Sequence, residues 1–193
     1  MHTSERPMRE LPLTRDALCD AVRAGATFKY VHFWGHRPGR DGVGKGCLSQ
    51  WWPVSFEVDG ETYRSAEHYM MAGKAKLFGD EATRRAILEA ETPAEAKKLG
   101  RRVTPFDPAV WEAHRFDIVV EGNVAKFGQD AALGDFLRGT AGRVLVEASP
   151  PDQIWGIGLG ASDDAAHDPC AWRGLNLLGF ALMVARDRLW GAP

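Results

Sequence analysis

The chain has 193 residues, of which 45% are hydrophobic and 26% are charged. This length and balance are those of one globular domain with a core of its own, and they exclude a disordered chain. The formal net charge of −2 excludes tight, non-specific binding to nucleic acid, because tracking duplex phosphates requires a basic surface.

The cysteine and hydropathy patterns indicate a cytoplasmic protein. Cys19, Cys47 and Cys170 are odd in number and form no C-x-x-C pair, which argues against a disulfide framework and against a structural zinc site. No apolar run reaches transmembrane length, and the N-terminal residues contain no signal-peptide hydrophobic region. We therefore expect no membrane partner, no metal and no other cofactor.

Before residue 65 the sequence predicts one helix and a little β structure. Residues 1–12 are expected to form a flexible tail, and residues 13–193 a single domain. A helix capped by Thr14 follows the tail, and strand signals then cover residues 28–34 and 54–64. Within the second strand region, Asp59-Gly60 predicts a type I′ hairpin turn, which needs positive φ at both central residues.

From Ser65 onward the pattern is helical. Polar caps, glycine stops and apolar periodicity predict a succession of helices, with Gly79, Gly100 and Gly128 each ending one. The expected helices cover residues 65–78, 80–90, 92–99, 107–127, 130–138 and 174–190, with a brief strand over 143–149 and a glycine-rich turn over 155–160. The fold class is therefore mainly α (α+β), with a small β element near the N-terminus.

Residues 39–46 read G-R-D-G-V-G-K-G, which is close to a phosphate-binding P-loop. The Ser or Thr that binds the metal is missing, and Pro53 prevents a helix where the P-loop needs one. We therefore exclude a nucleotide triphosphatase. Arg40 remains a candidate for contacting a substrate phosphate, and a solvated basic loop is the plainer interpretation.

The helix after Ser65 carries two ionisable groups on an apolar face. Glu67, Met71, Lys74 and Phe78 share one side of it, and burying charged groups is costly without partners or a wet pocket. About 10 Å along the axis separates Glu67 from Lys74, which leaves room for a sugar-sized ligand. The alternatives are an acid that complements the helix dipole and a lysine that extends to solvent.

Later segments supply further polar and aromatic candidates. Trp111 and Arg115 lie one turn apart on the long helix, where the alternative is a core tryptophan. Asp152 precedes a W-G-I-G sequence, and Asn176 falls in the first turn of the expected last helix. The glycines at 156–160 lack the strand and helix context of a Rossmann fold, which argues against dinucleotide binding by that fold.

Four segments taken together, in this order and spacing, resemble the NADAR superfamily, also called YbiA-like. They are SAEHYMMAGKAKLF, WEAHRFDIVVEGNVAKF, SPPDQIWGIGLG and WRGLNLLGFALM, and the resemblance runs from about Tyr30 to Leu189. It implies a YbiA-like helical array with a pocket for ribose-phosphate or ADP-ribose. It also implies N-glycosidase activity on guanine carrying ADP-ribose or on the ribosylated pyrimidine intermediates of riboflavin synthesis.

The resemblance implies catalytic roles for Glu67, Lys74 and Asp152. The pattern and the resemblance together give the candidate substrate-binding residues, which are Phe33, Trp34, Gly35, Arg40, Trp111, Arg115, Trp155, Gly156 and Asn176. Two positions depart from the family pattern: Gln50 stands where many members have Asn, and Ile157 replaces an Asp that some riboflavin-type members carry. The second departure favours ADP-ribosyl guanine, in a nucleotide or at a DNA end, as the substrate.

These residue types suit cleavage of a ribose C1–N bond. The reaction builds positive charge on the sugar, which a carboxylate such as that of Glu67 stabilises while it activates water. Lys74 either binds phosphate as a cation or attacks the opened sugar as a neutral amine, and the resemblance favours the amine. The rival from another class is a non-catalytic module that binds ADP-ribose or NAD.

Overall fold

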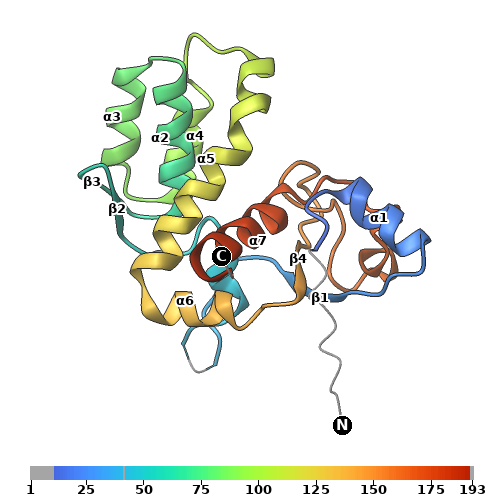
Figure 1. Ribbon diagram of the computed structural model, residues 1–193. Helices are drawn as coiled ribbons and strands as arrows, with labels where there is room; N and C mark the ends of the chain where they lie inside the picture. Colours follow the sequence, from blue (N-terminus) through green and yellow to red (C-terminus); the bar gives the residue numbers. More distant parts are fainter. Residues whose placement is uncertain (1–10, 41, 192–193) are drawn as a thin grey trace. The chain divides into compact units, whose positions relative to one another are not determined.

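Helices dominate the described part of the chain, residues 11–40 and 42–191, in the computed structural model (Figure 1). These residues form seven α-helices, four short strands and three 3₁₀ helices, so the mainly α (α+β) prediction is confirmed. They divide into two compact units. Unit 1 contains the described residues up to His32 together with residues 140–180, and unit 2 contains the remainder.

Unit 1 is built on a small sheet and short helical turns. Thr14 accepts a hydrogen bond from the Ala17 amide and so caps the first helix, as predicted. The two strands pair with each other, and the centre of the second, Val144 to Val146, is fully buried. Its elements are α1 (Arg15–Arg23), β1 (Lys29–Phe33), β4 (Arg143–Glu147), η2 (Asp164–His167) and η3 (Pro169–Ala171). The last residue of β1, Phe33, is the first residue of unit 2.

A disulfide joins Cys19 of α1 to Cys170 of η3, and the expectation of no disulfide is wrong. The two cysteines are 151 residues apart in sequence, so no local spacing reveals the pair. The third cysteine, Cys47, is free and buried in unit 2. The odd count therefore reflects one bridge and one core thiol.

Unit 2 begins with the predicted hairpin. Asp59 and Gly60 have φ of 53° and 79°, the positive values that a type I′ turn requires. In the register of the hairpin, Phe56 lies opposite Tyr63 and Val58 opposite Glu61. The elements of this unit up to residue 139 are η1 (Lys45–Leu48), β2 (Phe56–Val58), β3 (Glu61–Tyr63), α2 (Ala66–Leu77), α3 (Glu81–Glu89), α4 (Pro93–Gly100), α5 (Pro108–Gln129) and α6 (Ala131–Arg138).

Helix α2 is the centre of unit 2 and packs against α3, α4 and α5 (Figure 1). Its side chains are buried on several sides, from Ala66 and His68 to Met70, Ala72 and Ala75. The expected single apolar stripe is therefore only part of its contact surface. A helix enclosed in this way has its polar side chains fixed by neighbouring elements.

Several predicted helix ends are corrected by the structure. Gly100 is the last residue of α4 and lies against the Met71 side chain, so close packing requires it. Gly128 lies inside α5, which ends at Gln129, and Asp130 then caps α6. The last helix, α7 (Leu177–Trp190), begins three residues later than expected, because Asn176 has a φ of 56° and cannot belong to it.

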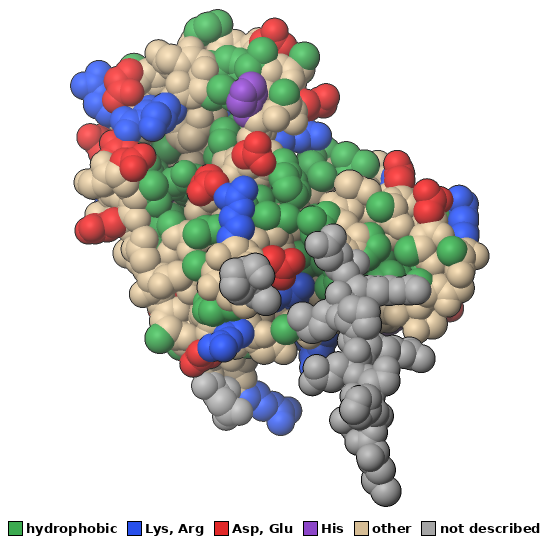
Figure 2. All heavy atoms as spheres, viewed as in Figure 1, with side chains coloured by type: hydrophobic (Ala, Val, Ile, Leu, Met, Phe, Trp, Pro, Cys, Tyr) green, Lys and Arg blue, Asp and Glu red, His purple; other side chains and the backbone are tan. Residues whose placement is uncertain are grey.

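Three further expectations concern membrane-spanning helices, the charge of the surface and the N-terminal tail. No helix of the described residues is long and apolar enough to cross a membrane. On the face that Figure 2 shows, the described acidic and basic side chains are interspersed. Most of the expected tail, residues 1–10, lies outside the described residues.

Candidate functional site

Glu67 lies in the first turn of α2 and is buried, with only 2% of it exposed. Its backbone amide donates to the Gln50 carbonyl at 2.9 Å. Nearby, the Ser65 hydroxyl caps the helix and bonds the His68 ring at 2.7 Å, and that ring also bonds the Ala90 carbonyl at 3.1 Å. Neighbouring segments thus hold the start of α2, and with it the acid, in place.

Lys74 lies two turns further along α2 and meets aromatic rings. Its Nζ donates to the Gly100 carbonyl at 2.9 Å and lies 4.2 Å from the centroid of the Phe106 ring and 5.7 Å from that of Trp111. No described carboxylate pairs with it. Burial among these groups lowers the pKa of the Lys74 amine, because removing water disfavours the charged form.

This environment suits Lys74 to act as a nucleophile. A lowered pKa gives a larger fraction of neutral amine at a given pH, and only the neutral amine carries a lone pair for attack. Trp111 is half-buried, so its ring forms a wall beside the amine and is not a fully buried core residue. The structure thus brings Lys74 and Trp111, two of the predicted site residues, close to each other.

The sequence analysis did not predict a buried polar cluster between α5 and residues 47–50. Lys126 of α5 is 0% exposed, and its Nζ donates to the carbonyls of Cys47 at 2.6 Å and Ser49 at 2.8 Å. Asn123, one turn earlier, donates to the Gln50 side chain at 3.0 Å. Burial lowers the pKa of the Lys126 amine to about 7. The signal in the sequence is a lysine inside the apolar N-V-A-K-F segment, whose chemistry depends on contacts with a distant loop.

In unit 1, Asp152 organises the turn that follows it. Its Oδ1 accepts hydrogen bonds from the amides of Ile154 and Trp155, each at 2.8 Å. Gly156 then packs so tightly that a Cβ would lie 2.9 Å from the Glu147 carbonyl oxygen. Asp152 and Trp155 are half-buried. The structure thus brings Asp152, Trp155 and Gly156 together in one turn.

Asn176 has a structural role that the sequence did not reveal. Its side chain is 0% exposed, its Nδ2 donates to the Leu145 carbonyl at 2.9 Å, and its Oδ1 accepts from the Glu147 amide at 2.9 Å. Both ends of the carboxamide are therefore bound to the backbone of β4, where they substitute for a strand partner. A ligand contact by Asn176 stays a prediction from the resemblance.

The other predicted binding residues occupy varied environments in unit 2. Phe33 is buried, whereas 63% of Trp34 is exposed, and Gly35 has a positive φ of 74°. Arg40 is exposed on the basic loop, and Arg115 lies 4.0 Å from Glu112 on the same helix. Neither a P-loop phosphate cradle nor its helix forms among the described residues of this loop, since η1 is a single 3₁₀ turn.

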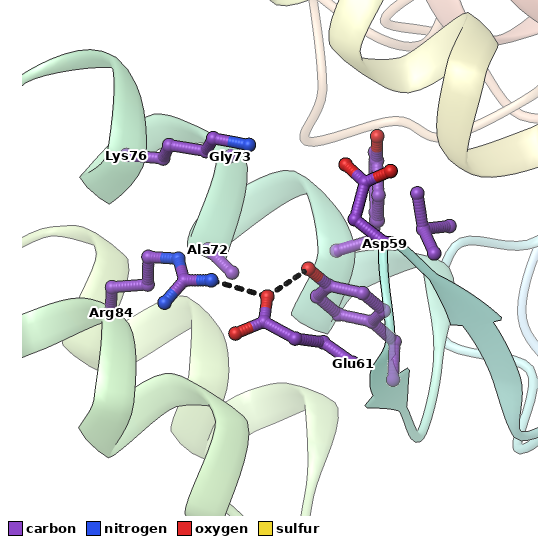
Figure 3. Close-up of a pocket in the computed structure, with 9 residues that line it drawn as sticks. Asp59, Glu61, Ala72, Gly73, Lys76 and Arg84 are labelled. Atoms are coloured by element: carbon purple, nitrogen blue, oxygen red, sulfur yellow. Dashed lines mark hydrogen bonds and ion pairs between the residues drawn. The ribbon is translucent and has the colours of Figure 1, made fainter. Parts of the chain in front are cut away.

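A polar cavity of about 290 Å³ lies on the opposite face of α2 (Figure 3). Ala72, Gly73 and Lys76 line it, and they lie about 100–180° around the helix from Glu67 and Lys74. At its centre Glu61 accepts hydrogen bonds from Arg84 and, at 2.9 Å, from the Tyr63 hydroxyl. These charges neutralise one another and tie the hairpin to α3, and no predicted site residue lines this cavity.

The model of one protein family, described as the NADAR domain, matches residues 32–190. The chain belongs to the NADAR family. The match spans the four segments on which the resemblance depended, so that recognition is confirmed.

Curated NADAR relatives give the activity class. An N-glycosidase of Acanthamoeba polyphaga mimivirus is 46% identical over 83% of this chain and 96% of its own length. N-glycosidase YbiA of Escherichia coli K12 is 34% identical over 72% of this chain and 76% of its own length. The chloroplastic riboflavin biosynthesis protein PYRR of Zea mays is 33% identical over 76% of this chain and 24% of its own length.

A solved NADAR structure supports the fold. The NMR structure of E. coli YbiA superposes with a TM-score of 0.66 and 29% identity, covering 85% of this chain and 86% of the other. With the names of the curated relatives, this makes the chain an enzyme of the N-glycosidase class, a hydrolase of N-glycosyl bonds.

Proposed function

We propose that this enzyme removes ADP-ribose from guanine bases by hydrolysing the ribose C1–N bond. The observation that carries the proposal is the pair on α2. A buried acid, Glu67, and an amine of lowered pKa among aromatic rings, Lys74, lie on one helical face about two turns apart. An acid and a nucleophilic amine with room for a sugar between them are the groups this reaction needs.

Glu67 acts on the sugar. As the C1–N bond lengthens, positive charge builds on the ribose, and a carboxylate held in a site of low polarity stabilises that charge more strongly than water does. The same carboxylate accepts a proton from the attacking water. In the net reaction the hydroxyl of water goes to C1 and its proton to the departing guanine nitrogen.

Lys74 acts as a covalent catalyst in this mechanism. The neutral amine forms a bond to C1, and guanine departs with the bonding electrons and takes up a proton. The C1–O4 bond then breaks, which opens the sugar and leaves an imine between Lys74 and C1. Water adds to the imine, the amine departs with the electrons of its bond to C1, and O4 closes on C1 again, which releases ADP-ribose and restores the amine. If Lys74 is instead a phosphate-binding cation, borohydride added during turnover leaves no adduct at Lys74, and the covalent step is excluded.

The substrate-binding roles extend the proposal to further residues. Trp111 provides a ring against which the base or sugar stacks beside Lys74. The catalytic role of Asp152 and the binding roles of Phe33, Trp34, Gly35, Arg40, Arg115, Trp155, Gly156 and Asn176 rest on the resemblance and the sequence pattern. Replacing Asp152 by Asn tests the first of them, with a fall in kcat as the expected result.

Ile157 favours the ADP-ribosyl substrate. Some riboflavin-type members carry Asp at this position, whereas the Ile157 side chain is apolar and 0% exposed, so it offers no hydrogen bond to a polar intermediate. Hydrolysis of ribosylated pyrimidine intermediates of riboflavin synthesis is the second candidate, and the name of the maize relative favours it.

The deciding experiment compares the two substrates. Incubation with an oligonucleotide carrying ADP-ribosyl guanine is expected to yield free ADP-ribose and unmodified DNA, with a larger kcat/KM than for the ribosylated pyrimidine. The reverse ratio selects the riboflavin reaction. Tight binding of ADP-ribose without turnover of either substrate, retained in Glu67→Gln, identifies a binding module and overturns the proposal.

We further propose that the enzyme acts in the cytoplasm. Disulfides are rare in that reducing compartment, so we expect Cys19 and Cys170 to be thiols there and to pair on oxidation. Alkylation of freshly lysed cells followed by mass spectrometry measures this directly. Full protection of both cysteines from alkylation contradicts the cytoplasmic assignment.

A further inference from the structure

Lys126 is a buried amine that the proposed chemistry does not use. It is 0% exposed, and no described carboxylate pairs with it. Its contacts are the ring of Phe127, 4.8 Å from the Nζ, and the carbonyls of Cys47 and Ser49. An amine is costly to bury, and an apolar residue would fill the same space more cheaply. Its presence therefore indicates a function for the two bonds it donates.

Those two bonds hold the first and third residues of a short segment, residues 47–50. At the other end of the segment, the Gln50 side chain accepts a hydrogen bond from Asn123 at 3.0 Å. Asn123 and Lys126 are three residues apart, so they lie on the same face of α5. Helix α5 thus fixes the segment at both ends.

The segment in turn holds the proposed acid. The Gln50 carbonyl accepts a hydrogen bond from the Glu67 amide at 2.9 Å. This amide belongs to the first turn of α2, where backbone donors have no partner within the helix. The position of Gln50 therefore sets where α2 begins and where the Glu67 side chain lies.

From this chain of contacts we infer that Lys126 is a positioning residue for Glu67, acting through residues 47–50. This inference rests on the proposed function of Glu67. Lys126 is not itself the nucleophile, because both of its described bonds face the backbone of the segment and none of its surface is exposed. Gln50 and Asn123 share the same role on the other side of the segment.

The test uses Lys126→Met, which keeps the unbranched shape of the side chain, shortens it by one atom and removes its donors. Leu133→Ala is the matched control, since Leu133 is a buried residue of α6 and belongs neither to residues 47–50 nor to α2. We expect kcat to fall at least tenfold in Lys126→Met with KM changed less than threefold. The control should lose stability and keep its kcat. Unchanged kcat in folded Lys126→Met overturns the inference.

Hydrogen exchange gives a readout that a purely structural role would not change. In Lys126→Met the protection of the Glu67 amide is expected to fall at least tenfold, while that of the Met71 amide changes less than twofold. Equal loss along all of α2 means general destabilisation and contradicts the inference. If Lys126→Met does not fold, kcat and the exchange of the Glu67 amide are measured in Asn123→Leu, which removes the hydrogen bond to the Gln50 side chain.

A double-mutant comparison separates this inference from the proposed function. If Lys126 acts through Glu67, adding Lys126→Met to Glu67→Gln lowers kcat by less than a further twofold. A double variant whose kcat falls by the product of the two single-variant reductions overturns the inference. If Glu67→Gln alone retains full activity, the proposed function fails. The exchange of the Glu67 amide then still decides whether Lys126 positions the start of α2.

Discussion

Asn176 offers a direct test of whether a residue expected to bind ligand serves the fold instead. Asn176→Ala removes two hydrogen bonds to β4, each with a net value of about 1 kcal/mol. It also leaves the Leu145 carbonyl and the Glu147 amide without their side-chain partner, which adds a desolvation cost. Placing alanine at a φ of 56° adds about 1 kcal/mol. We therefore expect a loss of about 3–5 kcal/mol in the free energy of unfolding.

Thermal unfolding followed by circular dichroism measures this loss. For a protein of this size the loss corresponds to a fall in Tm on the order of 10 °C. Asn176→Gly is the matched control, since it removes the same bonds without the backbone strain and should lose about 1 kcal/mol less. An unchanged Tm together with a raised KM would refute the reasoning and return Asn176 to the ligand site.

Three further outcomes follow from the contacts described above. Glu67→Gln should lower kcat by about 100-fold or more while its melting curve stays cooperative, as measured by release of ADP-ribose. The folded chain holds the pKa of Lys126 at about 7, below the usual 10.5, so the unfolded chain binds more protons between these values and stability rises with pH. Urea titrations should show that the free energy of unfolding rises by about 1–2 kcal/mol from pH 7 to 8.5, and Lys126→Met should lack this rise. Cys47 does not titrate in this range, because burial raises its pKa to about 11. Reducing the disulfide removes a constraint on a loop of 151 residues, and the loss of this constraint on the unfolded chain should lower the free energy of unfolding by about 5 kcal/mol. A Cys170→Ser variant as stable as the oxidised protein would contradict this prediction.

The roles of α2 and α5 explain why these predictions concern different properties. Helix α2 carries the proposed reacting groups, and α5 carries the donors that fix the loop before it. Changes on α2 are therefore expected to act on the chemical step. Changes to Asn123 and Lys126 of α5 are expected to act on the same step only through the position of Glu67.

Helix starts and turns that depend on neighbouring residues could be predicted from the sequence alone. Ser65, Asp80, Thr92 and Asp107 each begin a helix as predicted, because a polar side chain satisfies first-turn amides within three residues of it. The Asp59-Gly60 turn is local for the same reason, since its positive φ values come from the residues themselves.

Features that join distant segments depend on the folded chain and could not be predicted from local sequence. Periodicity placed Glu67 and Lys74 on one face of α2, but the Gly100 carbonyl and the Phe106 ring around the amine come from elsewhere in the chain. Sequence position could not reveal the Cys19–Cys170 pair or the burial of Lys126, because both depend on contacts between residues 77 or more positions apart. Glycine shows the same division: Gly60 serves a local turn, whereas Gly100 is required by the side chain of Met71.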